Sequence, residues 1–309
     1  MSTKSLAPKP KVLVILGTTS AGKTKLAVRL AAEFKGEIVS ADSRQVYQGL
    51  DVGSGKDLSE YRFGRRHIPY HLIDVVSPKS KFNVVRYQKL ARRALGDILK
   101  RGKLPIVVGG SGLYLQALID NYDFPSAARS AKLQKIYGAW PAEKLYQKIR
   151  RLQPEFAARL NNSDRHNPRR LLRYLEIVSA GVNRGAKQES PYDFLLLGLD
   201  CSDKILKKRI RERLLRRLAK EGLVAEVENL RLSGLSWRRL EAFGLEYKFV
   251  SQYLQGQLSY QVMVERLDAA IYRFAKRQKT WFKRWEKQGR KIKWIKGLAG
   301  ARAALKKWL

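Results

Sequence analysis

The stretch VLVILGTTSAGKT, residues 12–24, joins a short apolar run to a loop bounded by two glycines and then to the start of a predicted helix. Its spacing G-x-x-x-x-G-K-[ST] is typical of a P-loop and is formed by Gly17, Gly22, Lys23 and Thr24. In such a loop, backbone N–H groups and the helix N-terminus surround phosphate oxygens, and the lysine reaches the terminal phosphates. The stretch therefore predicts a phosphate-binding loop on a strand-to-helix turn, as in nucleotide-binding and ATP-binding proteins.

Apolar runs of strand length alternate with helical patterns on both sides of a central region. Residues 12–16 predict a strand, residues 23–34 a helix, and GEIVSADS at 36–43 a second strand with its loop. Residues 103–119 predict a strand, a glycine turn and a helix, and the run at 192–200 predicts another buried strand. This alternation indicates an α/β fold: a P-loop NTPase-like parallel sheet flanked by helices, with a helical insertion domain and a helical C-terminal region.

The expected domain organisation follows from where these patterns change. Residues 1–120 form the first part of the P-loop α/β core. Residues 121–190, in which no strand is predicted, form a helical insertion. Residues 191–309 complete the core with a strand near residues 193–200 and continue as basic helices.

The C-terminal region contains two long helical stretches. The first begins at Asp203, which we expect to be its N-cap. The second covers residues 259–289, where apolar residues recur mostly at steps of three or four. These residues are expected to be core positions first: Met263, Leu267, Ile271, Phe274, Trp281 and Trp285.

The charge of the chain indicates the kind of partner. With 63 Lys and Arg against 27 Asp and Glu, the formal net charge of the 309 residues is +36. This favours a polyanion, with nucleic acid first, over the alternative of a merely basic protein. A single cysteine excludes a disulfide framework and favours the cytoplasm. No apolar stretch reaches the length of a signal-peptide core or a membrane span, so no membrane partner is expected.

Two polar residues directly follow the predicted second strand. Asp42 and Ser43 should lie at the same carboxyl edge of the sheet as the loop, where ligands of open α/β sheets bind. Asp42 can then act as a general base, although an Asp-Ser pair can also simply cap a turn. Asp200, at the end of the strand predicted at 192–200, could instead anchor magnesium, as in kinases. Group transfer and kinase chemistry both stay open at this point.

Six stretches occur in the order known from one family. They are GTTSAGKT, SADSRQVYQGLDVGSGK, IPYHLIDVVSP, LPIVVGGSGLYLQALI, NPRRLLRYLEI and RFAKRQKTWFKRW. On these stretches the chain resembles the tRNA dimethylallyltransferase family, also called isopentenyl-tRNA transferases or IPP transferases, over most of its length. The resemblance implies transfer of a dimethylallyl group from its diphosphate to the exocyclic amine of the adenosine 3′-adjacent to the anticodon. Diphosphate would leave, and no ATP would be used.

The resemblance also implies roles for residues in and near the loop. Asp42 would accept a proton from the adenine amine, which is a poor nucleophile, and Thr19 would help to orient that amine. Lys23, the loop amides and a magnesium ion at Thr24 would neutralise the departing diphosphate. The expected diphosphate-binding residues are Gly17, Thr18, Thr19, Ser20, Ala21, Gly22, Lys23 and Thr24.

The same resemblance assigns residues to tRNA, whose target base must leave its stack to react. They are Asp42, Ser43, Arg44, Gln45, Ser111, Lys132, Arg169, Arg170, Arg173, Lys276, Arg277, Gln278 and Trp281, and they make the helical insertion a tRNA-binding domain. Taken alone, the basic run at residues 168–173 could be a solvated helix face. Likewise, Trp281 and Phe282 could be core residues rather than platforms for bases.

The chain departs from the family pattern at a few positions. Thr18 stands where proline is common, Ser111 where threonine is usual, and Lys132 where an arginine is expected. The segment LEAFGLEYKFVSQYL, residues 240–254, lacks the usual Gly-Tyr-Lys pattern, so no RNA contact is assigned there. One cysteine and three histidines exclude the zinc finger that some eukaryotic members carry.

Three other functions compete with tRNA prenylation. A small-molecule P-loop kinase would need Asp200, a prenyltransferase of free adenylate would use the same chemistry, and a non-catalytic RNA-binding protein would not need Asp42 beside Lys23. The large insertion and the net charge of +36 favour tRNA over a small acceptor. We therefore expect tRNA and dimethylallyl diphosphate as partners, magnesium as cofactor, and a monomer.

Overall fold

The computed structural model describes residues 8–125, 129–181 and 187–309. Its contacts divide the chain into two compact units, one of residues 1–119 and 190–309 and the other of residues 120–189. The first unit contains the sheet and the P-loop, and the second is helical.

The first unit begins with strand-helix-strand and ends with helices around a last short strand. Its elements are β1 (Lys11–Leu16), α1 (Lys23–Glu33), β2 (Gly36–Ala41), the 3-10 helix η1 (Leu58–Tyr61), β3 (Arg62–Phe63), β4 (Arg66–His67), β5 (Tyr70–His71), α2 (Val84–Lys100), β6 (Leu104–Gly109), α3 (Gly112–Ile119), β7 (Asp193–Leu199), α9 (Asp203–Ala219), α10 (Leu223–Leu232), α11 (Trp237–Phe243), α12 (Leu245–Leu254), α13 (Tyr260–Lys287), β8 (Lys293–Ile295) and α14 (Leu298–Trp308).

Within the described part of the chain, six parallel strands form the main sheet in the order β5-β2-β6-β1-β7-β8. The predicted parallel α/β sheet is thus confirmed. Gly109 at the end of β6 is in register with Leu16 on β1 and with Ala41 on β2. Because the carboxyl ends of these three strands stop at one level, the loops that follow them start side by side.

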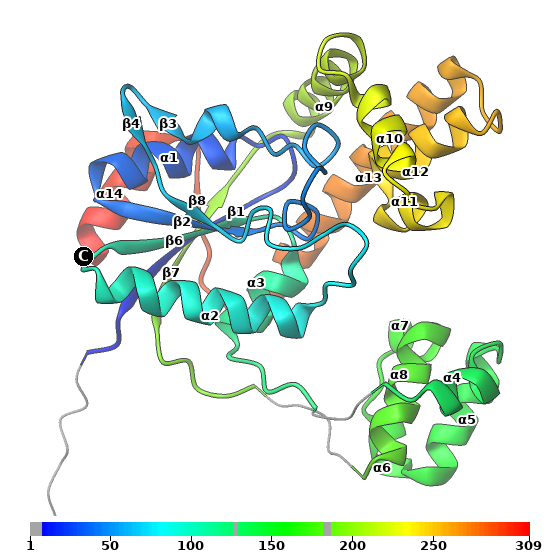
Figure 1. Cartoon of the computed structure of the whole chain (residues 1–309). Helices are drawn as coiled ribbons and strands as arrows, with labels where there is room; N and C mark the ends of the chain where they lie inside the picture. Colours follow the sequence, from blue (N-terminus) through cyan, green and yellow to red (C-terminus); the bar gives the residue numbers. More distant parts are fainter. Residues whose placement is uncertain (1–7, 126–128, 182–186) are drawn as a thin grey trace, which may run out of the picture. The chain divides into compact units, whose positions relative to one another are not determined.

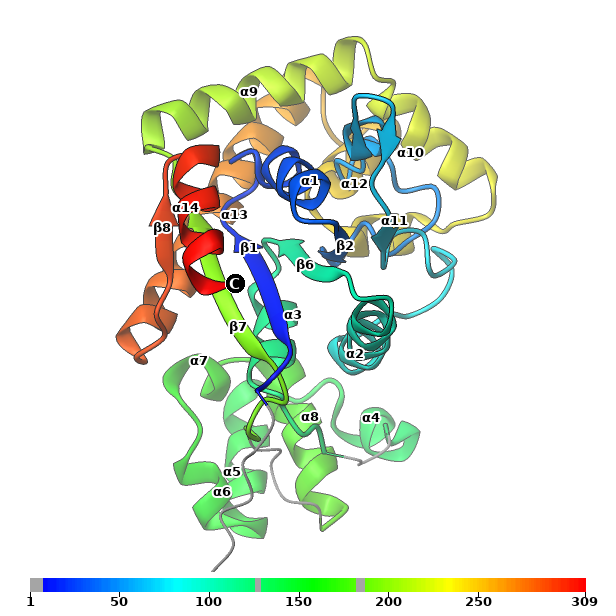
Figure 2. The same cartoon turned by 90° about the vertical axis from the view of Figure 1, so that its left-hand side faces the viewer.

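Helices cover both faces of the sheet (Figure 1). Leu13 and Ile15 of β1 pack with α1 and α14 on one face, while Val12, Val14 and Leu16 pack with α2, α3 and the end of α13 on the other. This alternation is the period of two expected of a strand, and burial on both faces explains the unbroken apolar run. In Figure 2, α14 lies beside β7 and β8 at the sheet edge.

The backbones of β2 and β6 approach so closely that Gly109 has no room for a side chain. A Cβ on Gly109 would lie 2.2 Å from the carbonyl oxygen of Ala41, which is backbone and cannot rotate away. We expect Gly109→Ala to lower the free energy of unfolding by about 1–3 kcal/mol, measured by chemical denaturation. Gly96→Ala is the control, because it lies inside α2 with nothing within 4 Å of its Cβ and should stabilise by about 0.5–1 kcal/mol. Equal effects of the two substitutions would contradict the expected clash.

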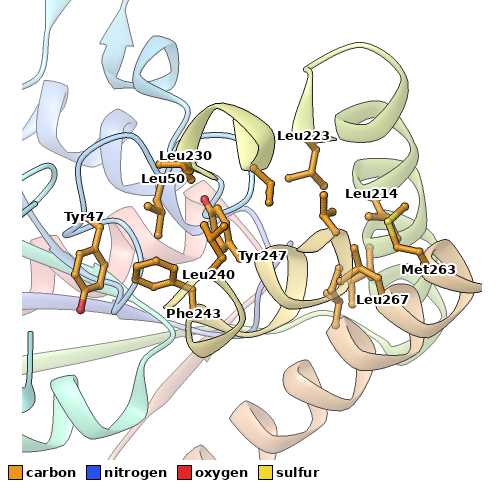
Figure 3. Close-up of a cluster of buried hydrophobic side chains, with 14 of the residues drawn as sticks. Tyr47, Leu50, Leu214, Leu223, Leu230, Leu240, Phe243, Tyr247, Met263 and Leu267 are labelled. Carbon is orange, nitrogen blue, oxygen red and sulfur yellow. The ribbon is translucent and has the colours of Figure 1, made fainter. Parts of the chain in front are cut away.

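A second core of this unit lies among the C-terminal helices (Figure 3). Leu214 of α9, Leu230 of α10, Tyr247 of α12 and Leu267 of α13 pack there against the segment at residues 46–50, which follows β2. The C-terminal helices are therefore fixed directly to the loop region beyond the sheet edge.

The second unit is built from short helices around its own core. These are α4 (Ala131–Tyr137), α5 (Ala142–Leu152), α6 (Pro154–Ala158), α7 (Asn162–Arg165) and α8 (Pro168–Ser179). The core contains Leu145 and Ile149 of α5, Phe156 of α6 and Leu171 and Leu175 of α8. Among the described residues 129–181 of this unit no strand occurs, as the sequence predicted.

Several details differ from the sequence prediction. The cap of α9 is Ser202, whose hydroxyl accepts a hydrogen bond from the N–H of Ile205, while Asp203 is the first helical residue. The helical stretch that starts there is interrupted before α10, which begins after Gly222. Of the six residues expected in the core of α13, Phe274 and Trp281 are only half-buried. No helix of the described residues is both long and apolar enough to cross a bilayer.

Candidate active site

A cavity of about 660 Å³ lies at the carboxyl edge of the sheet in the first unit. Its walls come from the loops after β1, β2 and β6, from the segment at residues 51–61, and from α9 and α13. Residues far apart in the sequence therefore meet there. Among the residues predicted for the site, those that line it are Thr19, Ser20, Gly22, Lys23, Thr24, Asp42, Gln45 and Gln278.

The P-loop leads into α1 at the edge of this cavity. Gly22 is the N-cap of α1 and has a φ of 93°, a left-handed conformation that glycine adopts without strain. The Lys23 amine donates a hydrogen bond to the carbonyl oxygen of Thr18 at 2.7 Å. The loop thus combines a helix N-terminus with a lysine folded over it, as phosphate binding needs. The remaining loop residues, Gly17, Thr18 and Ala21, do not line the cavity.

Burial disfavours the charged forms of two cationic side chains that line the cavity, Lys23 and Arg213. Burial lowers the pKa of Lys23 to about 8, against an opposing effect of the Asp42 carboxylate and with a further lowering by Arg213. Burial and the neighbouring Arg217 likewise lower the pKa of Arg213 to about 10. Because an anion between them would favour both charged forms, the cavity is electrostatically suited to a polyanionic ligand.

Asp42 caps a turn and also lines the cavity. Its Oδ1 accepts hydrogen bonds from the N–H groups of Arg44 at 2.8 Å and Gln45 at 3.4 Å, so the carboxylate caps the turn after β2. The side chain also lines the cavity with Lys23. Among the described residues no hydrogen bond engages its Oδ2, which leaves one oxygen able to accept a proton.

Gln278 of α13 joins two loops of the site. Its Oε1 accepts a hydrogen bond from the Thr19 N–H at 2.8 Å, and its Nε2 donates to the carbonyl oxygen of Gly110 at 2.9 Å. Both ends of the amide are thus engaged by the protein itself, and the tRNA contact expected from the sequence stays a prediction. Gln278 ties the P-loop to the turn after β6.

Other predicted residues of the first unit lie near the same sheet edge. The Ser111 hydroxyl accepts a hydrogen bond from the Ser43 N–H at 3.2 Å. Arg44 donates through Nε to the carbonyl oxygen of Phe243. The indole of Trp281 lies against Gly112, and the Arg284 guanidinium stacks over it at 4.3 Å. The structure therefore groups the turns after β2 and β6, while the side chains of Lys276 and Arg277 are exposed on α13.

The predicted residues of the second unit are divided between two environments. Arg170 pairs with the buried carboxylate of Asp164 at 2.9 Å, and Arg173 pairs with the buried Glu176 at 3.0 Å. Removing either arginine would leave a buried charge with less compensation, so both stabilise the unit. Lys132 and Arg169 are exposed.

Sequence reasoning missed the basic face of α9. Arg209, Arg213 and Arg217 recur every four residues and line the cavity, together with Arg216. The i, i+4 spacing was visible in the sequence, but only packing shows that this face is turned toward the P-loop. Arg217 is already paired with the buried Glu246 at 3.1 Å. Arg213 forms no ion pair or hydrogen bond with the described residues, so its guanidinium is available to a ligand.

Two other charged residues of the first unit have different surroundings. Asp200, the candidate of the kinase hypothesis, lines a separate cavity of about 500 Å³ and accepts a hydrogen bond from the Cys201 N–H. Lys56 is buried and forms ion pairs with Asp51 and Asp74. Its amine therefore stabilises a loop and is not available to a ligand.

The site fits a magnesium ion only together with a bound phosphate. Thr24 and Asp42 both line the cavity, and among the described residues no group of three or more His, Cys, Asp or Glu side chains could hold a metal alone. Magnesium commonly takes few protein ligands and completes its shell with substrate phosphates and water. The donor set is consistent with that mode.

The first unit has a parallel sheet with a P-loop after its inner strand β1 and a carboxylate, Asp42, after β2, from which β1 is separated by β6. These features define a P-loop-type α/β protein. Family models agree on a narrower class: IPP transferase matches residues 45–285, and isopentenyl transferase matches residues 10–70. The chain belongs to the IPP transferase family.

Individual relatives support this assignment. The tRNA dimethylallyltransferase 1 of Syntrophus aciditrophicus is 47% identical over 289 residues, which are 93% of each chain. The crystal structure of a tRNA isopentenylpyrophosphate transferase from Bacillus halodurans is 32% identical, with a TM-score of 0.68 and coverage of 93% and 90% of the two chains. A eukaryotic dimethylallyltransferase acting on tRNA is 28% identical, with a TM-score of 0.72, over 88% of this chain and 69% of that one.

Proposed function

We propose that this chain is a tRNA dimethylallyltransferase. It transfers the dimethylallyl group of dimethylallyl diphosphate to the exocyclic amine of the adenosine 3′-adjacent to the anticodon, and diphosphate leaves. The relatives that carry this name cover 93% of the chain at up to 47% identity. The observation that carries the proposal is that Lys23 and Asp42, a diphosphate-binding lysine and a base, line one cavity.

The reaction divides the cavity into two halves. The P-loop backbone, Lys23 and Arg213 bind the diphosphate and stabilise its growing negative charge as the allylic carbon becomes cationic. Asp42 accepts the proton of the adenine amine through Oδ2, while Oδ1 holds the turn. Thr19 of the P-loop lines the same cavity and orients the amine. A magnesium ion at Thr24 would offset further charge on the leaving group.

The acceptor tRNA is held by polar, basic and aromatic residues of both units. In the first unit we assign Ser43, Arg44, Ser111, Lys276, Arg277 and Trp281 to tRNA, and in the second unit Lys132, Arg169, Arg170 and Arg173. Gln45 and Gln278 act by shaping the site, because their amides bond to the backbone of Gly55, Thr19 and Gly110. A tRNA substrate also makes the cytoplasm the compartment we propose, and we propose that the enzyme acts as a monomer.

Arg213 provides a specific test of the donor half. We expect Arg213→Ala to raise the KM for dimethylallyl diphosphate about tenfold or more, because a charge-assisted contact to the diphosphate is lost. Steady-state kinetics at saturating tRNA measure this, and Arg213→Lys should recover part of the loss. Arg211→Ala, which removes an exposed charge from the same helix, is the control. A normal donor KM in Arg213→Ala would place the diphosphate elsewhere.

The function itself is tested by supplying its substrates alone. The protein is incubated with unmodified tRNA, dimethylallyl diphosphate and magnesium without ATP, and the nucleosides of the digested tRNA are weighed by mass spectrometry. A dimethylallyl-adenosine is the expected product. If no prenylated nucleoside forms and the protein instead hydrolyses or transfers the phosphate of ATP, the kinase hypothesis replaces this one.

A further inference from the structure

A single carboxylate holds the loop that forms one wall of the cavity. Glu226 of α10 accepts hydrogen bonds from three successive backbone N–H groups: Asp51 at 2.9 Å, Val52 at 2.6 Å and Gly53 at 3.0 Å. Successive N–H groups form a concave anion site, and bonds to a charged acceptor are among the strong ones. The side chain of Glu226 thus replaces a bound anion in this loop.

A buried phenol completes the environment of Glu226. The hydroxyl of Tyr247 donates a hydrogen bond to Oε1 of Glu226 at 2.8 Å. Burial raises the pKa of Tyr247 well above its usual value, so the phenol remains a donor at any working pH. Tyr247 of α12 therefore fixes the carboxylate of Glu226, which in turn binds the backbone of the loop.

The loop that Glu226 holds continues into the cavity wall. Val52, Ser54, Gly55 and Lys56 line the cavity. The buried amine of Lys56 bonds to the carbonyl oxygen of Tyr47 at 3.1 Å and to the carboxylate of Asp51 at 2.5 Å. Lys56 thus fixes the end of the loop, while Glu226 holds the backbone at its start.

Hydrogen bonds lead from this loop to the proposed base. The carbonyl oxygen of Gly55 accepts a bond from Nε2 of Gln45 at 3.2 Å, and Oε1 of Gln45 accepts a bond from the Ser40 hydroxyl at 2.9 Å. The N–H of Gln45 is one of the two groups that bond to Oδ1 of Asp42. The side chain of Gln45 thus joins the loop to the turn that presents Asp42.

We propose that Glu226 is a positioning residue for prenyl transfer. By fixing the loop at residues 51–55, it fixes Gln45 and through it the direction of the Asp42 carboxylate. The inference rests on the proposed function for its catalytic consequence, but the coupling between loop and turn does not depend on it.

The test compares two substitutions on one helix that change the charge equally. Glu226→Gln keeps the shape but replaces one accepting oxygen with an NH₂ group that cannot accept. Glu228→Gln is the matched control, because Glu228 is exposed two residues further along α10. We expect Glu226→Gln to lower kcat about tenfold to a hundredfold with the KM for tRNA within about twofold, and Glu228→Gln to resemble the wild type.

Two readouts separate positioning from general stability. Hydrogen exchange followed by mass spectrometry should show faster exchange in Glu226→Gln both at residues 51–55 and at residues 42–45, with β6 unchanged. In a double-mutant cycle, adding Gln45→Ala to Glu226→Gln should cost less than the sum of the single losses in kcat, because both act through one path.

The outcomes are distinct. Unchanged kcat, unchanged exchange at residues 42–45, additive losses, or equal losses in the Glu228→Gln control would each overturn the inference. If the wild type forms no prenylated tRNA, the proposed function fails, and the exchange measurement still decides whether Glu226 controls the turn. If Glu226→Gln does not fold, Tyr247→Phe removes one donor to the same carboxylate and should shift kcat and exchange in the same direction, and no shift would equally overturn the inference.

Discussion

Asp42→Ala is expected to lower kcat for prenyl transfer about a hundredfold to ten-thousandfold while tRNA affinity stays near that of the wild type. A positioned general base contributes about this much, and the adenine amine cannot react well while it retains its proton. Single-turnover assays with saturating substrates measure the chemical step, and a binding assay without donor measures tRNA affinity.

The variant Asp42→Asn distinguishes the role of Asp42 as a base from its role as the cap of the turn. Its amide oxygen can still accept the N–H groups of Arg44 and Gln45, so the turn after β2 keeps its cap. We expect Asp42→Asn to be nearly as inactive as Asp42→Ala and closer to the wild type in the free energy of unfolding. An asparagine variant with close to normal kcat would show that Asp42 acts only as a cap.

Lys23→Ala is expected to lower kcat/KM for dimethylallyl diphosphate about a hundredfold, because removing one electrostatic contact to the leaving group costs about 3 kcal/mol of barrier. Both KM and kcat should change, since the diphosphate is bound in the ground state and gains charge on leaving. Lys25→Ala is the control: it removes an equal charge two residues further along α1, and Lys25 lines the other cavity. Equal losses in the two variants would assign the effect to net charge alone.

The pH dependence of kcat/KM for dimethylallyl diphosphate should show the titration of the Lys23 amine. Burial lowers the pKa of Lys23 to about 8, so in the free enzyme the amine is charged below that pH and neutral above it. Because the charged form binds the diphosphate, kcat/KM for the donor should fall as the pH rises through about 8. Lys23→Arg, whose guanidinium stays charged, should lose this limb of the profile, and a limb that persists in Lys23→Arg belongs to another group.

The sheet could be predicted because its signals are local. The run at residues 12–16 and the strand near residues 193–200 are continuous and apolar since both faces of the sheet are covered, and they form β1 and β7. The short edge strand β8 was not predicted, because three residues that pair only with β7 are too few to show a periodic hydrophobic pattern. The break between α9 and α10 was missed although Gly222 marks it, because the apolar residues continue on both sides.

The meeting of Lys23 and Asp42 could also be predicted, because the parallel strands of one sheet, here β1 and β2 on either side of β6, end at one edge. The site residues that the sequence could not predict are those that helix packing places beside the P-loop. Arg213 lies 190 residues from Lys23 in the sequence, and its approach depends on how α9 packs on the C-terminal core. The engagement of Gln278 with two backbone groups depends in the same way on the placement of α13.

That placement of α13 has a thermodynamic consequence. The helix exposes Lys276 and Arg277 to solvent, and one turn of it also reaches the N–H of Thr19 through Gln278. A movement of α13 and a rearrangement of the P-loop are therefore coupled through one hydrogen bond. In the proposed function this bond offers a route by which tRNA on α13 and the donor in the P-loop would affect each other's affinity, and linkage requires the two factors to be equal whichever substrate binds first.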